Sequence, residues 1–488
     1  MEIRDIQALF FKNIGIKQTV LKNTFWLAAA EVISGFFRLL LLIYVARILG
    51  ANEYGKFTFA FSFVSVMVLF SDLGIIDIVT REFSRNKEKE KELPVLIALE
   101  VILTAATLLL MIAGSFFITS DQYIRRLIWI LAFFILSSSF FGIFVAFLRG
   151  RQKMEYEAVI KIIHTFMLVG LCFVGIFYFP SAIALGYSYL ATNVFFVIIL
   201  LLFFHFHFQH IRIRWDKNMF KILKISWPLS LGYVPIWIYI SISSVMLGYF
   251  NLITENGWYN AASKIALITM IPADLIIRSF YPVLSNLFVN SKEILQKSWN
   301  YLMSLMIFLV MPIVVGGITL APKIIHFFYG ASFNPSILAF QLLMVVVAIN
   351  FIHYPYGVML IVSDHQKKNF FLIIAGIIIN VILNIIFIPW YGFYGAIISV
   401  IISSLIILFL TMIISRNFIE ISLFNIKLLK YSMVAGLFSY VTFCVINLPF
   451  VYRLNIFYSI AIGALTYFIL CFLFYKIYKN SNLFTKIF

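Results

Sequence analysis

Five basic residues lie inside long apolar runs of this sequence: Arg38, Arg47, Lys161, Lys264 and Arg278. A charge at the centre of a membrane span costs roughly 2.5–3.5 kcal/mol on insertion scales, so it normally faces a partner, a cavity or the interface. Cations in such places can replace water around an anion, and they can do so without making or breaking a covalent bond. These residue types therefore favour electrostatic binding of an anionic cargo.

Arg38 lies near the middle of the first apolar run, and Glu31 lies seven residues earlier on almost the same helical face. Either Arg38 binds an anionic group and Glu31 orients it, or the two residues form an ion pair and nothing more. Lys161, near one end of the fifth run, either reaches lipid headgroups or anchors its helix at the interface. Arg47 is expected to be an interfacial anchor.

The eighth run carries a polar stripe. At 100° per residue, Asn260, Lys264, Asp274 and Arg278 fall within about 80° of one another, which predicts a face that lines water. Pro272 can kink this helix and shift the register. Arg278 can also extend to the interface, since a long basic side chain can keep its charged end in water.

Asp72 and Asp77 lie near the end of the second run and either pair with Arg81 or carry a coupling ion. We expect no catalytic residues, no metal site and no cofactor. His205, His207 and His210 alternate with phenylalanines, a pattern that favours an interfacial cluster over a metal site.

Composition places these residues in a membrane. Of the 488 residues, 63% are hydrophobic and 12% are charged, and the mean hydropathy is +1.02. Ordinary soluble domains are roughly 45–50% apolar and about 25% charged, so we predict an all-α polytopic membrane protein whose solvent is the bilayer. The net charge of +17 is spread over short loops, which argues against nucleic-acid binding.

A helix needs about 20 apolar residues to cross a bilayer. The sequence predicts about 14 transmembrane helices, over 24–49, 57–80, 94–118, 127–148, 157–179, 183–204, 225–249, 257–286, 298–320, 336–361, 369–388, 394–415, 430–447 and 456–475.

The basic residues orient these helices. With the N-terminus in the cytoplasm, 27 of the 37 Lys and Arg residues fall on the cytoplasmic side and five on the other side. This asymmetry agrees with the positive-inside rule. We therefore predict a multi-pass protein of the cell membrane with both termini in the cytoplasm.

The chain repeats itself at half length. Ile48-Leu49-Gly50 and Glu53-Tyr54-Gly55 between the first two runs correspond to Met246-Leu247-Gly248 and Gly257-Trp258-Tyr259 between the seventh and eighth. Because six is even, the two halves form a parallel repeat. The predicted parts are a cytoplasmic segment 1–22, a lobe of six helices over 23–204, a cytoplasmic linker 205–224, a second lobe over 225–415, and a final helix pair with a cytoplasmic tail over 416–488.

Several segments resemble the polysaccharide-transporter family. The run from Asn380 to Ala396, NVILNIIFIPWYGFYGA, is similar to a hallmark of that family, as is Phe328–Phe333. Arg47–Gly55 resembles the opening of the family's sequences, and Tyr259–Lys264 resembles its eighth span.

The resemblance implies membership of the multidrug/oligosaccharidyl-lipid/polysaccharide exporter (MOP) superfamily, which includes Wzx-type flippases, lipid II flippases and drug exporters. It also implies two six-helix lobes around a central cavity that opens alternately to either side. The expected function is a flippase for a polyprenyl-diphosphate-linked oligosaccharide. The expected partners are that substrate, membrane lipids and polysaccharide assembly enzymes.

Three alternatives remain. A cation-coupled drug or metabolite exporter would place acidic residues deep in its cavity, whereas most deep charges here are basic. The extra helix pair is more typical of a lipid II flippase. A membrane glycosyltransferase would need catalytic groups on a sizeable outer loop, and the outer loops hold only Glu53, Asp121 and Glu255 on separate short turns.

Overall fold

The computed structural model describes residues 15–207, 214–216, 218–230, 234–419 and 426–480. Within these ranges the chain forms helices and turns and no strand. Its internal contacts divide it into two compact units, Met1–Gly257 and Trp258–Phe488. The lobe boundaries were predicted from a sequence repeat and not from contacts, so this division does not test them and they stay a prediction.

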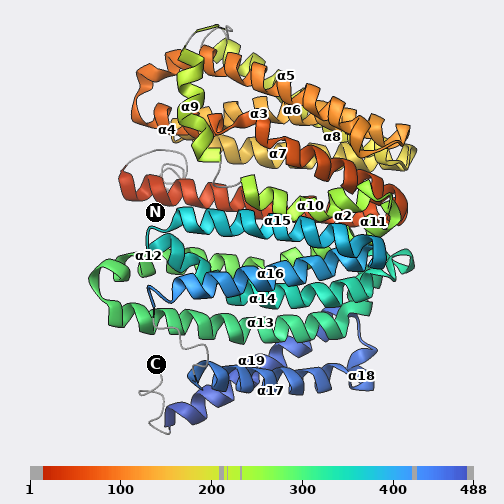
Figure 1. Ribbon diagram of the computed structural model, residues 1–488, viewed down its shortest axis with the longest axis vertical. Helices are drawn as coiled ribbons and strands as arrows, with labels where there is room; N and C mark the ends of the chain where they lie inside the picture. Colours follow the sequence, from red (N-terminus) through yellow and green to blue (C-terminus); the bar gives the residue numbers. More distant parts are fainter. Residues whose placement is uncertain (1–14, 208–213, 217, 231–233, 420–425, 481–488) are drawn as a thin grey trace, which may run out of the picture. The chain divides into compact units, whose positions relative to one another are not determined.

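The helices of the first unit follow the predicted apolar runs (Figure 1). The 26 residues of one of them, Leu93–Ile118, extend about 39 Å, more than the ~30 Å hydrocarbon core. The elements are α2 (Ile16–Met67), α3 (Leu69–Asp72), α4 (Ile75–Arg85), the 3-10 helix η1 (Lys87–Glu92), α5 (Leu93–Ile118), α6 (Gln122–Gly150), α7 (Met154–Tyr178), α8 (Ala182–His207), α9 (Asn218–Ser230), α10 (Val234–Tyr249) and the start of α11 (Ile253–Ile268).

Helix α2 changes direction at Gly50. Its 52 residues are helical except at this glycine, where φ is 72° and ψ is 175°. A side chain at that φ would be strained, so glycine allows the kink. A straight helix of this length would extend about 78 Å, far more than one bilayer crossing. Helix α2 therefore has two arms joined by a kink and no loop.

The kink of α2 packs tightly against the start of α11, and the contact is reciprocal. A Cβ atom at Gly55 would lie 1.9 Å from the carbonyl oxygen of Ile253, and one at Gly257 would lie 2.0 Å from that of Ala51. Asn256 Nδ2 donates to the Gly55 carbonyl at 2.9 Å. The equivalent residues of the two halves, Gly55 and Gly257 as well as Ala51 and Ile253, are each 202 positions apart, as expected for two copies of one turn.

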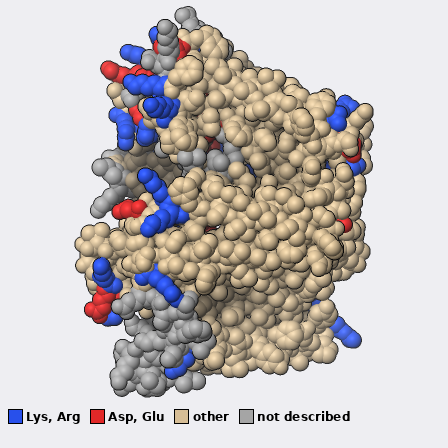
Figure 2. All heavy atoms as spheres, in the orientation of Figure 1, with Lys and Arg blue, Asp and Glu red and all other residues tan. Residues whose placement is uncertain are grey.

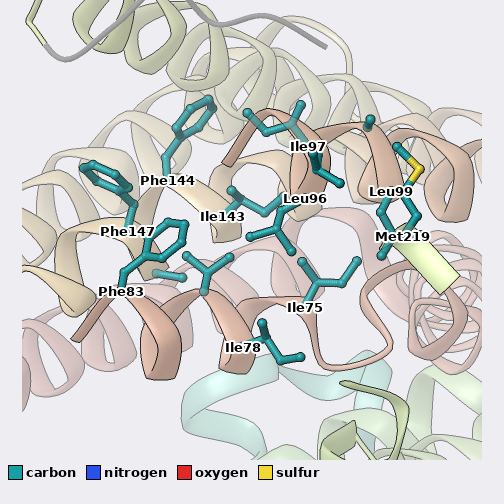
Figure 3. Close-up of a cluster of buried hydrophobic side chains, with 14 of the residues drawn as sticks. Ile75, Ile78, Phe83, Leu96, Ile97, Leu99, Ile143, Phe144, Phe147 and Met219 are labelled. Carbon is teal, nitrogen blue, oxygen red and sulfur yellow. The ribbon is translucent and has the colours of Figure 1, made fainter. Parts of the chain in front are cut away.

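A hydrophobic cluster joins α4, α5, α6 and α9 (Figure 3). Phe83 of α4 meets Phe147 of α6 edge to face, with ring centroids 5.8 Å apart. Leu96 of α5 and Met219 of α9 complete the packing, each less than a tenth exposed. The six consecutive residues Val95–Glu100 of α5 are thus all buried, so this turn of the helix is covered on every side.

The second unit continues with long helices (Figure 1). Asn380 holds two of them together, because its Nδ2 donates to Ser403 Oγ at 3.2 Å while its Oδ1 accepts from Asn384 at 2.9 Å. These elements are the rest of α11, α12 (Ile271–Asn290), α13 (Lys292–Tyr329), η2 (Ala331–Phe333), α14 (Ser336–Val362), α15 (Gln366–Tyr391), α16 (Phe393–Ser415), α17 (Ile426–Ile446), α18 (Pro449–Tyr452) and α19 (Ile456–Asn480).

Within the described residues, ten helices are long and apolar enough to cross a membrane, or up to eleven if the bent pair α11 and α12 counts as one span. The figure of ten takes the kinked stretch Gln18–Asp72 as a single span. Two shorter apolar helices, Pro235–Tyr249 and Lys430–Ile446, fall below the length limit. The count by length alone is therefore smaller than the fourteen predicted from the sequence.

Candidate functional site

The predicted residues Glu31, Arg38 and Lys161 come together in the first unit, on α2 and α7, which pack side by side. Arg38 Nη2 lies 3.7 Å from Glu31 Oε2, and Lys161 Nζ forms an ion pair with Glu31 Oε1. Two cations thus share one carboxylate, and the cluster carries one net positive charge. This arrangement differs from both simple pictures of Arg38, because Glu31 holds a second cation from another helix.

Backbone contacts fix the cluster in place. Arg38 Nε donates to the carbonyl oxygen of Ser34 at 3.2 Å, and Ser34 Oγ donates to the carbonyl oxygen of Lys161 at 3.5 Å. The side chains of Arg38 and Glu31 are 47% and 61% exposed. The excess positive charge is therefore held in position and is also accessible to a ligand.

A cavity of about 630 Å³ lies at one end of the first unit. Most of its wall is apolar, and hydroxyl, amide and guanidinium groups lie among the apolar atoms, where they can contact a hydrated ligand. The lining residues include Thr19, Asn23, Thr24 and Leu27 of α2, Thr80 of α4 and Arg149 of α6.

The charged cluster lies further along α2, on a face of the helix that also contributes to the cavity wall. At 100° per residue, Thr24, Leu27, Glu31 and Arg38 lie within about 60° on one face of the helix. The fourteen residues from Thr24 to Arg38 rise about 21 Å. One face of α2 thus carries polar groups through much of the ~30 Å hydrocarbon thickness.

Two ion pairs that sequence reasoning missed stand near this cavity. Lys22 Nζ lies 2.9 Å from Glu155 Oε2, with side chains 0% and 9% exposed. Arg149 Nε donates to both carboxylate oxygens of Glu157, at 2.8 and 3.0 Å. The sequence does carry a signal for these pairs: Glu155 and Glu157 begin an apolar run. Buried acids need cations from other parts of the chain.

Charged residues also gather at this end of the first unit. Figure 2 shows Lys and Arg atoms concentrated over α4 and α9, with fewer at the opposite end of the first unit. Within the unit this distribution resembles the asymmetry that the sequence predicted.

In the second unit the predicted polar stripe is divided between two helices. Asn260 and Lys264 belong to α11, whereas Asp274 and Arg278 belong to α12, and the helices are bent by 41° where they meet. Pro272 stands in the first turn of α12. The register of one straight helix, from which the stripe was predicted, does not hold across this break.

The two halves of the stripe also differ in exposure. Arg278 Nε lies 2.8 Å from Asp274 Oδ2, and these side chains are 75% and 52% exposed. Asn260 is 6% exposed, and Lys264 is half-buried. The residues of α11 are therefore better shielded from solvent than the ion pair on α12.

Asp72 lies at a break in the second run, between α3 and α4. Its Oδ1 accepts a hydrogen bond from the backbone N–H of Ile76 at 2.9 Å, so it caps the start of α4. Arg81, the partner considered from the sequence, instead lies 3.0 Å from Glu82.

Among the described residues, no group of three or more His, Cys, Asp or Glu side chains is arranged to hold a metal ion. His210, the last of the three clustered histidines, lies outside the described residues.

Solved structures with this architecture define the class of the fold. An inward-closed structure of lipid II flippase MurJ is 19% identical, has a TM-score of 0.69, and matches over 91% of this chain and 98% of that one. An inward-facing multidrug resistance transporter of the MATE family, assigned to the MOP superfamily, is 15% identical with a TM-score of 0.65, over 81% of this chain and 97% of that one. An outward-facing MATE-family transporter is 14% identical with a TM-score of 0.53, over 86% of this chain and 98% of that one. The chain therefore has the fold of MOP transporters.

The model of the family described as polysaccharide biosynthesis protein matches residues 20–288, more than half of the 488. The chain belongs to this family. Its fold is that of the multi-pass membrane transporters of the MOP superfamily. The resemblance proposed from the sequence is thereby confirmed. No curated sequence matches the chain significantly.

Proposed function

We propose that the protein is a flippase that moves a polyprenyl-diphosphate-linked oligosaccharide across the cell membrane. The observation that carries this proposal is the cluster of Arg38 and Lys161 on Glu31, which leaves one accessible positive charge within a membrane helix pair. A diphosphate is the anionic group that such a cluster suits, because Arg holds phosphate oxygens through two parallel hydrogen bonds. Membership of a polysaccharide biosynthesis family supports a sugar as the attached group.

The physical problem of such a transporter is the head of its substrate. The polyprenyl tail can remain in lipid, but a charged and hydrated head needs a polar path. The cavity at the end of the first unit and the polar face of α2 supply hydroxyl, amide and charged groups along such a path. Related folds have been solved in inward-facing and outward-facing conformations, which supports transport by alternating access.

We further propose fourteen spans in two parallel lobes of six and a final pair, with both termini in the cytoplasm. Counting the two arms of α2 separately and adding the two shorter apolar helices raises the eleven apolar spans to fourteen. The reciprocal contact of the α2 kink with the start of α11 supports the repeat, since each turn repeats after 202 positions.

The substrate could instead be lipid II, another lipid-linked sugar diphosphate, as in the structurally similar flippase MurJ. That substrate would use the same cluster. A cation-coupled drug exporter is the competing class, because the MATE-family structures share the fold. It would carry lipophilic cations, which the net positive cluster would repel.

The test is transport of a fluorescent polyprenyl-diphosphate oligosaccharide by the protein reconstituted in lipid vesicles. A charge-assisted hydrogen bond contributes about 1.5–3 kcal/mol, so Arg38→Glu should reduce the rate by about tenfold or more. Arg38→Lys should keep part of the rate. Lys297→Gln is the control, because Lys297 belongs to an exposed ion pair on α13.

Wild-type transport by Arg38→Glu would contradict the binding role of Arg38. If the wild-type protein moved lipophilic cations and no diphosphate lipid, the flippase proposal would be wrong.

A further inference from the structure

Glu100 is an acidic residue buried within α5. It is 0% exposed, and neither carboxyl oxygen has a hydrogen bond of normal geometry to the described residues. An ionised carboxylate without a partner in an apolar interior costs several kcal/mol, whereas the protonated acid costs far less. Glu100 therefore presents a buried group whose stable form in this conformation is neutral.

The residues that precede Glu100 on α5 belong to an apolar cluster. Leu96 and Leu99, on the preceding turn of α5, point into the hydrophobic cluster together with Ile75 of α4 and Ile143 of α6 (Figure 3). Such packing offers no cation to balance a negative charge.

The polar neighbours of Glu100 increase the cost of ionisation. Asp72 acts on Glu100 as a like charge, and Ser139 of α6 lies near its carboxyl group. The Ser139 hydroxyl already shares a hydrogen bond of 3.0 Å with Ser71 Oγ. With Asp72 ionised, a second negative charge at Glu100 would face repulsion and burial together.

The two carboxyl groups differ in their environments. Leu73 and Gly74, with φ of 40° and 82°, interrupt the second run beside them. Asp72 accepts the Ile76 N–H at the start of α4, where the helix dipole favours a negative charge. The start of α4 therefore stabilises a negative charge on Asp72, whereas Glu100 has no comparable hydrogen-bond donor.

Helix α6, which packs along α5, carries its charged residues Arg125, Arg126 and Arg149 near its two ends. Asp77 of α4 acts on Asp72, and Arg81 pairs with Glu82. On η1 and α9 the exposed charged residues include Glu88, Lys91, Glu92, Lys221 and Lys224.

We infer that Glu100 is a proton-binding site of this transporter, occupied in the conformation seen here. Its carboxylate takes one proton from water to become the neutral acid. It returns that proton to water when α3 and α4, which meet at Leu73 and Gly74, move away from α5. The inference needs only that the chain is a membrane transporter, and it does not depend on which lipid is carried.

The test is infrared spectroscopy of the purified protein in lipid nanodiscs at neutral pH. A protonated carboxyl group has a C=O band that a carboxylate lacks. This band should be weaker in Glu100→Gln than in the wild type, and it should lose intensity in the wild type as the pH rises. Glu157→Gln is the matched control, because Glu157 is also buried but is paired with Arg149. An unchanged band in Glu100→Gln would overturn the inference.

A second measurement uses the wild-type chain, in case Glu100→Gln does not fold. A hydrophobic carbodiimide modifies protonated carboxyl groups in apolar surroundings, and mass spectrometry locates the modified residue. Glu100 should be modified at neutral pH, and several-fold less at high pH, while Glu157 should stay unmodified. Absence of modification at Glu100, or modification that does not change with pH, would overturn the inference. Neither readout involves lipid transport, so a failure here is distinct from a failure of the proposed flippase.

Discussion

Glu31 contacts two cations, Arg38 of its own helix and Lys161 of α7. The contact with Lys161 determines what should happen when the charges at positions 31 and 38 are exchanged. If Glu31 and Arg38 formed an isolated pair, the double variant Glu31→Arg with Arg38→Glu would rebuild it with the partners reversed. Lys161 breaks this symmetry, because it reaches position 31 from α7. An arginine at position 31 would face Lys161 as a like charge.

We therefore expect the exchange Glu31→Arg with Arg38→Glu to leave transport as low as in Arg38→Glu alone. Adding Lys161→Glu to the exchange should restore packing of α2 on α7, because a carboxylate at position 161 would face the arginine at position 31. It should not restore transport of an anion. Transport in vesicles and thermal unfolding of each variant measure the two effects. Full rescue of transport by the double exchange would contradict an anion-binding role for Arg38.

Single residues were predictable where they broke an apolar pattern. Arg38, Lys161 and Lys264 were found because a charge in an apolar run is visible in the sequence. Their partners were not, since Lys161 and Glu31 are separated by 130 positions and only the fold joins them. Glu100 was missed although it interrupts the third apolar run, a signal of the same kind.

At the scale of elements, the contact between the α2 kink and the start of α11 has no space for a side chain. Gly55→Ala would place a Cβ 1.9 Å from the Ile253 carbonyl oxygen, and backbone cannot yield as a flexible side chain can. We expect this substitution to destabilise the protein by about 1–3 kcal/mol. Thermal unfolding in detergent, with transport measured alongside, tests the expectation.

Gly35→Ala is the matched control, because Gly35 lies in the same helix and a Cβ there meets nothing within 4 Å. It should be neutral or slightly stabilising, since alanine favours helix by about 1 kcal/mol over glycine. Equal stability of the two variants would show that the tight contact contributes little.

The helices themselves were predictable from apolar periodicity, whereas their internal breaks were not. Pro272 signalled a possible kink, but the 41° bend and the division into α11 and α12 depend on packing. The interruption at Leu73 and Gly74 gave a weaker signal still, because leucine rarely adopts a positive φ.

At the scale of the whole molecule, the orientation in the membrane can be tested at the two ends of one helix. Lys91 precedes α5 and Gln122 follows it, and both are exposed. In a variant without the native cysteines, Gln122→Cys should react with an impermeant maleimide in intact cells. Lys91→Cys should react only after permeabilisation. Reaction of both sites in intact cells, or the reverse pattern, would contradict the predicted topology.

The fold class and the family followed from composition and a few motifs because both are spread over the whole chain. The run from Asn380 to Ala396 combines a buried polar pair with a turn. Asn380 joins α15 to α16 through Ser403, and Asn384 bonds to Asn380 within α15. The number of helices counted by length could not be predicted, because the two arms of α2 meet at the Gly50 kink without a loop and count as one helix, whereas the sequence shows them as two apolar runs.

The absence of a loop at the α2 kink also limits how the length of this chain can vary. A loop absorbs an inserted or deleted residue, but one residue added between Ala51 and Thr58 would rotate everything after it by about 100° and shift it by about 1.5 Å. Thr58 and Phe59, now 5% and 0% exposed, would turn out of their contacts. Natural variants should therefore keep this segment at constant length, while insertions should be tolerated near the exposed residues of η1, such as Glu88 and Lys91.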